Sequence, residues 1–192
     1  MFALQAMLVF ALAAVLGVGS AWWAVDREVA VEQLQVGGWT AWPTAGEPGA
    51  DPYVRALFAR TGELPMNIAE GLSFAARRDS EGMLLRADCQ YRVAGAVPAA
   101  GWWTLSVYRD ETHTLIDNPA ERYGFASAEA LREPDGTVEI VVAPRARPGN
   151  WIPVDPEAGN LRLVFRLYET PLSVGGAIDA IEMPEIEREG CL

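Results

Sequence analysis

The chain begins with a long run of apolar positions. Residues 2–25, FALQAMLVFALAAVLGVGSAWWAV, carry no charge, and Gln5 and Ser20 are the clearly polar side chains in the run. As an α-helix the run would extend about 36 Å, enough to cross a hydrocarbon core of about 30 Å. Trp22 and Trp23 stand just before the first charges, where interfacial aromatic side chains gather. The pattern predicts a single transmembrane helix over residues 2–25.

A cleaved signal peptide is the alternative, with Gly19 and Ala21 as small residues before the cut. The length of the run, the lack of Lys or Arg ahead of it and the adjacent tryptophans favour an uncleaved anchor. The segment that follows is acidic and has few arginines near the membrane, so it is easier to translocate than to retain. We therefore expect a single-pass protein of the bacterial inner membrane whose C-terminal domain faces the periplasm.

The pattern changes after the anchor. Residues 26–36 can continue helically for two or three turns, whereas residues 37–50 are typical of a linker, because they hold glycines, two prolines and no periodicity. Trp39 and Trp42 in this linker are expected to pack back onto the domain or to lie near the lipid headgroups. If exposed, they are candidate interface aromatics. We therefore expect an anchor over residues 1–25, a helical extension and linker over 26–50, and a domain over 51–192.

The domain starts with a short helix and continues with period-two alternation. Asp51 followed by Pro52 favours a helix start, and this helix is expected to end near Gly62. Alternating apolar positions then predict strands within residues 72–76, 89–93, 101–108, 137–143 and 161–168, with turn-forming residues between them. In the last strand the leucines and Phe165 are expected to face inward, and Arg162 and Arg166 outward. The domain is therefore predicted to be mainly β, an antiparallel sandwich with one or two short helices.

Charge excludes one class of partner. The chain holds 26 acidic and 15 basic residues, every basic one an arginine, for a net charge of −11. Nucleic-acid binding needs a basic face that neutralises phosphates, so we expect none. The same charge argues against docking of the domain on an anionic lipid surface.

The two cysteines leave two interpretations open. Cys89 opens a predicted strand and Cys191 is next to last, with no spacing typical of metal ligands. In an oxidising compartment they can form a disulfide that holds the C-terminus against the sheet. Alternatively, Cys89 is a small buried residue and Cys191 is free.

His113 is the first candidate for chemistry. It is the single histidine, and Asp110, Glu111 and Asp117 lie close to it in the sequence. A metal site or a general base needs partners of fixed geometry, whereas these are flexible carboxylates in a predicted turn. We interpret His113 as an exposed turn residue after the Trp102–Tyr108 strand, and we expect no metal and no cofactor.

Five further residues are candidates for ligand binding: Arg122, Tyr123, Asn150, Trp151 and Arg166. Arg122 with Tyr123 can clamp a carboxylate or phosphate, or can form an ordinary ion pair and fill the edge of the core. Asn150 suits a turn, Trp151 suits a buried anchor, and Arg166 with Arg162 suits a small positive strip. A single pocket lined by all five would favour an enzyme or ligand-binding protein. Scattered positions would favour a scaffold.

An ordered set of segments resembles a known family. The chain shows Cys89-x-Tyr91, WWTLSVY, IDNPAERYGF, DGTVEI, PGNWIP and LVFRLYETP in that order, within residues 49–171. These resemble the bacterial domain-of-unknown-function family numbered 1214, in its short, membrane-anchored branch. The family's usual final element keeps Gly175, Gly176 and Pro184 here but lacks its tryptophan.

The resemblance implies a jelly-roll-like β-sandwich and a partner. Larger members carry a second β domain, of family 1254, in the same chain, and the short branch divides the two into separate anchored proteins. No reaction is agreed for the family, so it supplies no catalytic residues. The leading hypothesis is a non-enzymatic envelope domain that binds a family 1254 membrane protein. The alternative is a hydrolase-like envelope enzyme or a small-ligand-binding protein whose site is shared with that partner.

Overall fold

The computed structural model describes residues 2–26, 32–171 and 181–192. The start of the predicted helical extension, residues 27–31, lies outside this part of the chain, as do Gly175 and Gly176.

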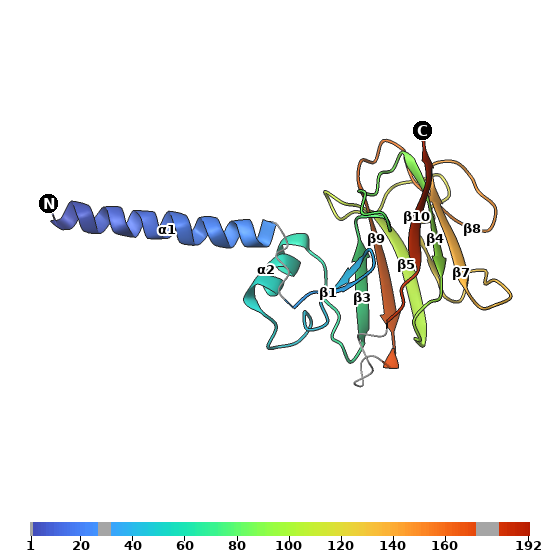
Figure 1. Cartoon of the computed structure of the whole chain (residues 1–192), viewed down its shortest axis with the longest axis horizontal. Helices are drawn as coiled ribbons and strands as arrows, with labels where there is room; N and C mark the ends of the chain where they lie inside the picture. The colour runs from blue at the N-terminus through green and yellow to red at the C-terminus, as the bar shows by residue number, and fades with distance from the viewer. Residues whose placement is uncertain (1, 27–31, 172–180) are drawn as a thin grey trace.

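The apolar N-terminal run forms one helix, α1 (Phe2–Asp26), as predicted. None of its residues is buried, and it extends away from the rest of the molecule (Figure 1). By length and composition it can cross a membrane.

Residues 42–50 hold turns and a bend without helix or strand, but the predicted helical extension and linker is wrong over residues 34–41. Here the chain forms a hairpin of two short strands, β1 (Leu34–Val36) and β2 (Trp39–Ala41), joined at Gly37, whose φ of +57° suits glycine. Three-residue strands are too short to show a periodicity against the surrounding glycines and prolines. Burial of a tryptophan side chain stabilises the hairpin instead.

Trp39 and Trp42 are buried, so the proposal that they are exposed interface aromatics is wrong. Trp39 is 1% exposed, and its Nε1 donates to the Pro184 carbonyl oxygen at 2.7 Å. Trp42 packs in a second, smaller core with Ala45 and two residues of the following helix.

That helix, α2 (Pro52–Thr61), has the predicted ends. The Asp51 carboxylate accepts a hydrogen bond from the Tyr53 N–H at 2.8 Å, and Gly62 closes the helix with φ of +71°. Val54 and Leu57 are buried against Trp42, and the Phe58 ring meets the Trp42 ring edge-on. The apolar side of α2 therefore belongs to the smaller core.

The remaining strands are β3 (Gly71–Ala76), β4 (Cys89–Gly95), β5 (Trp102–Arg109), β6 (Gly124–Ala126), β7 (Val138–Ala143), β8 (Asn150–Pro153), β9 (Leu161–Tyr168) and β10 (Glu185–Cys191). In the described part of the chain one sheet has the order β1-β2-β3-β9-β5-β6 and the other the order β10-β4-β7-β8. The sandwich predicted from the alternation is confirmed (Figure 1). One pair departs from the antiparallel pattern, because β7 and β8 run parallel. Asn150, predicted to form a turn, begins β8.

The main core lies between the sheets. Trp103, Leu105 and Val107 of β5 are at most 2% exposed, which confirms their predicted inward direction. They stand opposite Leu167, Phe165 and Leu163 of β9 in the register. Arg162 lies on the face of β9 opposite to the core, but its predicted exposure is wrong. This face is covered, and the residue is 5% exposed. The cover is the segment after α2, which contains Glu63.

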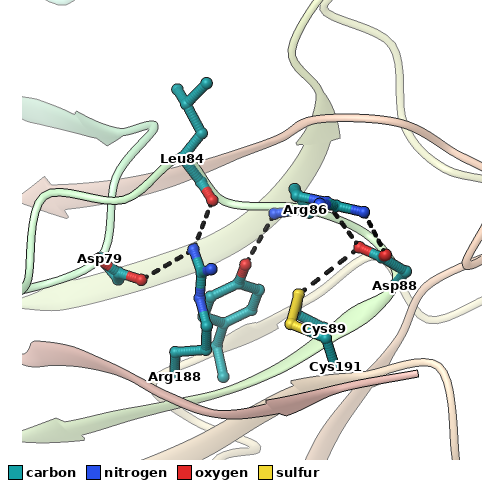
Figure 2. Close-up of a disulfide and its surroundings, with 8 residues drawn as sticks. Asp79, Leu84, Arg86, Asp88, Cys89, Arg188 and Cys191 are labelled. Atoms are coloured by element: carbon teal, nitrogen blue, oxygen red, sulfur yellow. Dashed lines mark hydrogen bonds and ion pairs between the residues drawn. A yellow bond between two sulfur atoms is a disulfide. The ribbon is translucent and has the colours of Figure 1, made fainter.

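β10 returns the chain to the edge of the smaller sheet beside β4. Cys191 pairs with Cys89 in the register, their Cα atoms lie 3.8 Å apart, and the two sulfurs are bonded (Figure 2). The disulfide interpretation is confirmed, and the end of the chain is fixed to the sheet.

Candidate functional site

Arg122 is positioned by the loop between β5 and β6. The Asn118 amide oxygen accepts from the Arg122 backbone N–H at 3.1 Å, and its nitrogen donates to the carbonyl oxygens of Ile116 and Arg122. The Arg122 guanidinium then reaches the carbonyl oxygen of Trp151 at 3.3 Å and lies over the Phe125 ring. The sequence Asn118-Pro119 thus builds the turn that brings Arg122 to β8.

Trp151 is held by the neighbouring strand. Its indole N–H donates to the carbonyl oxygen of Ala143 at 3.0 Å, and its side chain is half-buried. Beside it lies a hollow of about 520 Å³ whose walls include Pro119, Ala120, Pro144 and Pro153. We call this hollow the Trp151 groove. Its walls are mostly proline and apolar surface, and they also include Asp117 and Asp155.

Tyr123 and Asn150 have structural roles. The Tyr123 carbonyl oxygen accepts from the Val107 N–H, which ties the loop to β5. The Asn150 side chain is buried, accepts from the Leu131 N–H, and donates to the carbonyl oxygens of Leu131 and Glu139, each at 2.8 Å. With its amide satisfied by backbone groups, Asn150 locks the β6–β7 connection to β8.

Arg166 lies away from the Trp151 groove. It is on the outer face of β9, where its guanidinium donates to the Tyr108 hydroxyl at 3.4 Å and lies over that ring. The structure therefore brings Arg122 and Trp151 together, keeps Tyr123 beside Arg122 through the backbone, and separates Arg166. The five predicted residues do not line one pocket.

His113 is not the exposed turn residue that the sequence predicts. It follows β5 as expected, in a turn where its φ is +56°, but its side chain is 18% exposed. Its Nδ1 lies 2.7 Å from Nη1 of Arg162 and 3.1 Å from Oε1 of Glu63. Since a guanidinium N–H always donates, Nδ1 accepts from Arg162 when it carries no proton itself.

The acids close to His113 in sequence bind elsewhere. Asp110 pairs with Arg77 at 2.6 Å, and a Glu111 oxygen accepts from the Asn160 amide. The acid that meets His113 is Glu63, 50 residues earlier, which no local pattern indicates. Among the described residues no group of three or more His, Cys, Asp or Glu side chains is arranged to hold a metal ion.

A second hollow, of about 790 Å³, lies beside β10 and was not predicted from the sequence. Its walls include Arg92, Glu139, Glu185 and Glu187, from three strands. Arg92 binds Glu187 at 2.8 Å and Glu139 at 3.3 Å, so the arginine offsets part of the acidic charge. These residues alternate on β4, β7 and β10 as solvent-facing positions, which gives no sequence signal of a shared cavity.

Polar contacts lie around β4 and β10, the two strands that the disulfide joins. The Tyr91 hydroxyl accepts from the Arg86 N–H at 2.8 Å, and Arg188 of β10 bridges the Asp79 carboxylate and the Leu84 carbonyl oxygen (Figure 2). Burial raises the pKa of the Tyr91 hydroxyl, although the hydrogen bond from Arg86 acts in the opposite direction. The C-terminal strand is therefore held by ionic and covalent links together.

Comparison with known proteins decides the family. A family model described as "Protein of unknown function (DUF1214)" matches residues 70–172, which contain β3 to β9 and the Trp151 groove. The chain belongs to the DUF1214 family. A search of curated proteins finds no significant match.

Two solved structures resemble this DUF1214 chain. The VPA0106 protein from Vibrio parahaemolyticus has a TM-score of 0.60 and 19% identity over 74% of this chain, and 36% of its own chain is covered. An uncharacterized protein from Burkholderia cenocepacia has a TM-score of 0.48 and 21% identity over 90% of this chain, and 41% of its own chain is covered. This chain thus spans less than half the length of each. The first likeness supports the shared fold.

Proposed function

We propose that this DUF1214 chain is a membrane-anchored envelope domain that binds a second anchored protein, of family 1254. In this proposal α1 crosses the bacterial inner membrane once and the sandwich faces the periplasm.

One observation carries the binding role. Of the five candidate residues, Arg122 and Trp151 adjoin, and Trp151 lines an open groove with proline walls. Arg and Trp are enriched among the residues that contribute most to protein interfaces. Asn150 and Arg166 are engaged in other contacts. A surface of this kind suits a polypeptide partner better than it suits the chemistry of a small substrate.

The family supports the choice of partner. The resemblance implies that larger members carry the family 1254 domain in the same chain, which would keep the pair together. The VPA0106 protein is likewise longer than this chain, which covers 36% of it. Anchoring two separate proteins in one membrane restores part of that effective concentration without a fusion.

The envelope location has two supports. α1 is long and apolar enough to span a bilayer, and the Cys89–Cys191 disulfide suits an oxidising compartment such as the periplasm.

Co-expression with a family 1254 protein from the same source tests the proposal. A tag on this chain should retain the second protein in mild detergent, with an interface of at least about 1,000 Å² in the complex. The chain should also keep its N-terminal helix and resist carbonate extraction. A stable monomer that never retains the second protein would contradict the binding role, and an N-terminus near Trp22 would contradict the anchor.

A further inference from the structure

The end of α1 is in direct contact with α2. The Arg60 guanidinium lies 2.7 Å from the Asp26 carboxylate and 4.6 Å from the centre of the Trp22 ring. Figure 1 shows α2 between α1 and the larger sheet. Because Trp22 lies near the end of the apolar run, Arg60 stands at the level where a spanning helix leaves the hydrocarbon core.

The side of α2 away from the smaller core carries side chains suited to a lipid surface. Tyr53 is 45% exposed and shares a helix face with Arg60, two turns later. Arg55 is also exposed. Leu64, three residues beyond the helix, is 91% exposed, the highest value among the large apolar side chains that surround the sandwich.

Charge at α2 is opposite in sign to that of the whole chain. The helix contains two arginines and no acid, although the net charge of the protein is −11. Three acids that flank or contact α2 are engaged: Asp26 with Arg60, Asp51 with the start of α2, and Glu63 with Arg162. A guanidinium has five donors and binds phosphate oxygens well, so Arg60 can keep Asp26 and still bind a lipid phosphate.

We propose that α2 lies on the surface of the bilayer that α1 crosses. Arg55 and Arg60 bind lipid phosphates, while Tyr53 and Leu64 enter the boundary between headgroups and acyl chains. This second contact fixes the orientation of the sandwich, with the outer face of the larger sheet toward the membrane and β8 away from it (Figure 1). The inference rests on the proposed membrane anchoring and adds a lipid-binding surface to it. The net charge of −11 then opposes lipid docking by the rest of the domain.

Lipid quenching of a single fluorophore tests this orientation. Both cysteines are in the disulfide, so Leu64→Cys introduces one free thiol into the full chain. Leu131→Cys is the matched control, because Leu131 is 66% exposed and its backbone is bound to Asn150 at the start of β8. Each variant is labelled and reconstituted in vesicles of phosphatidylethanolamine and phosphatidylglycerol, with nitroxide carried on a lipid headgroup.

We expect the label at residue 64 to be quenched several-fold more than the label at residue 131. Replacing both arginines, as Arg55→Gln with Arg60→Gln, should weaken quenching at residue 64 while the protein still floats with the vesicles. Equal quenching at the two positions in floating protein would overturn the lipid surface and leave the anchor intact. Protein that does not float at all would instead contradict the anchor on which the inference rests.

Discussion

At the residue scale, the covered outer face of β9 depends on a pair of opposite charges. Arg162 has a side-chain exposure of 7%, and its two terminal nitrogens lie 2.5 and 3.2 Å from the two oxygens of Glu63. Bidentate pairs of a guanidinium with a carboxylate are among the stronger charge-assisted hydrogen bonds. They hold the segment after α2 against the sheet, so they also set where α2 lies.

Glu63→Gln should therefore destabilise the fold. The substitution keeps the shape but removes the charge that offsets a buried guanidinium, and breaking such a pair costs about 3 kcal/mol. Glu139→Gln is the control, because the Arg92 pair is 34% and 47% exposed and should contribute about 0–1 kcal/mol. Urea unfolding of the two variants measures the difference. Equal losses would show that Glu63 does not hold a buried charge.

Tyr91 gives a prediction about alkaline pH. Burial raises its pKa above the ordinary value of about 10, so the folded state keeps a proton that the unfolded chain loses. The stability this provides is complete below pH about 10 and is lost as the pH rises through the folded pKa. Tyr91→Phe should make the alkaline fall in unfolding free energy shallower, at a cost of about 1 kcal/mol at neutral pH for the lost bond to Arg86. An unchanged alkaline slope would contradict a raised pKa for Tyr91.

Local sequence predicts little of the His113 environment. Asp110 and Glu111 suggest an acidic turn, yet both bind other residues. Glu63, which contacts His113, lies 50 residues before it in the sequence, and Arg162 lies 49 residues after it. Neither separation leaves a periodic signal, because the contact depends on how the segment after α2 folds over the sheet.

At the element scale, alternation was the informative signal for the long strands. β5 and β9 are eight residues each and alternate clearly, so their inward faces followed from the sequence. β1, β2 and β6 have three residues each, too few for a period of two to be distinguished from loop composition. For the same reason the hairpin that carries Trp39 could not be predicted, although packing of Trp39 onto the domain was one of the two expected outcomes.

The adjacent tryptophans Trp102 and Trp103 lie on opposite faces of β5, so substituting each one tests which face is buried. Trp103 is 2% exposed in the main core, so Trp103→Ala should cost about 3–5 kcal/mol. Trp102 is 45% exposed and stacks on Tyr168 with ring centroids 3.8 Å apart, so Trp102→Ala should cost about 1 kcal/mol. Denaturant midpoints of the two variants give the ratio, and a larger loss for Trp102 would contradict the assigned faces.

The disulfide should stabilise β10 more than the rest of the sandwich. It joins residues 102 positions apart, a closure that contributes about 4.7 kcal/mol in the chain-entropy model. Reduction should lower the melting temperature and speed amide hydrogen exchange in β10 before it does so in β9. A variant with both cysteines replaced by alanine should not respond to reductant. Unchanged exchange in β10 after reduction would show that hydrogen bonds to β4 hold the strand without the bridge.

At the scale of the whole molecule, α2 and β8 lie on opposite sides of the sandwich. α2 adjoins the end of α1, whereas β8, which carries Trp151, lies across the sheets from it (Figure 1). In the proposed arrangement the domain therefore rests on the membrane by one side and presents β8 away from the lipid. The family and the sandwich were accessible from the sequence. The groove was not, because its walls combine the loop between β5 and β6 with segments joined by the pairing of β7 with β8.

The most direct test of the central claim is the amount of family 1254 protein retained by the tagged chain in mild detergent. Ala120 is exposed in the wall of the groove, and Ala128 is exposed outside it. Ala120→Arg should lose most of the retained protein, because the long side chain fills the groove, while Ala128→Arg adds the same charge and should retain as much as the unmodified chain. Retention at background level by all three chains, including the unmodified one, would contradict the account.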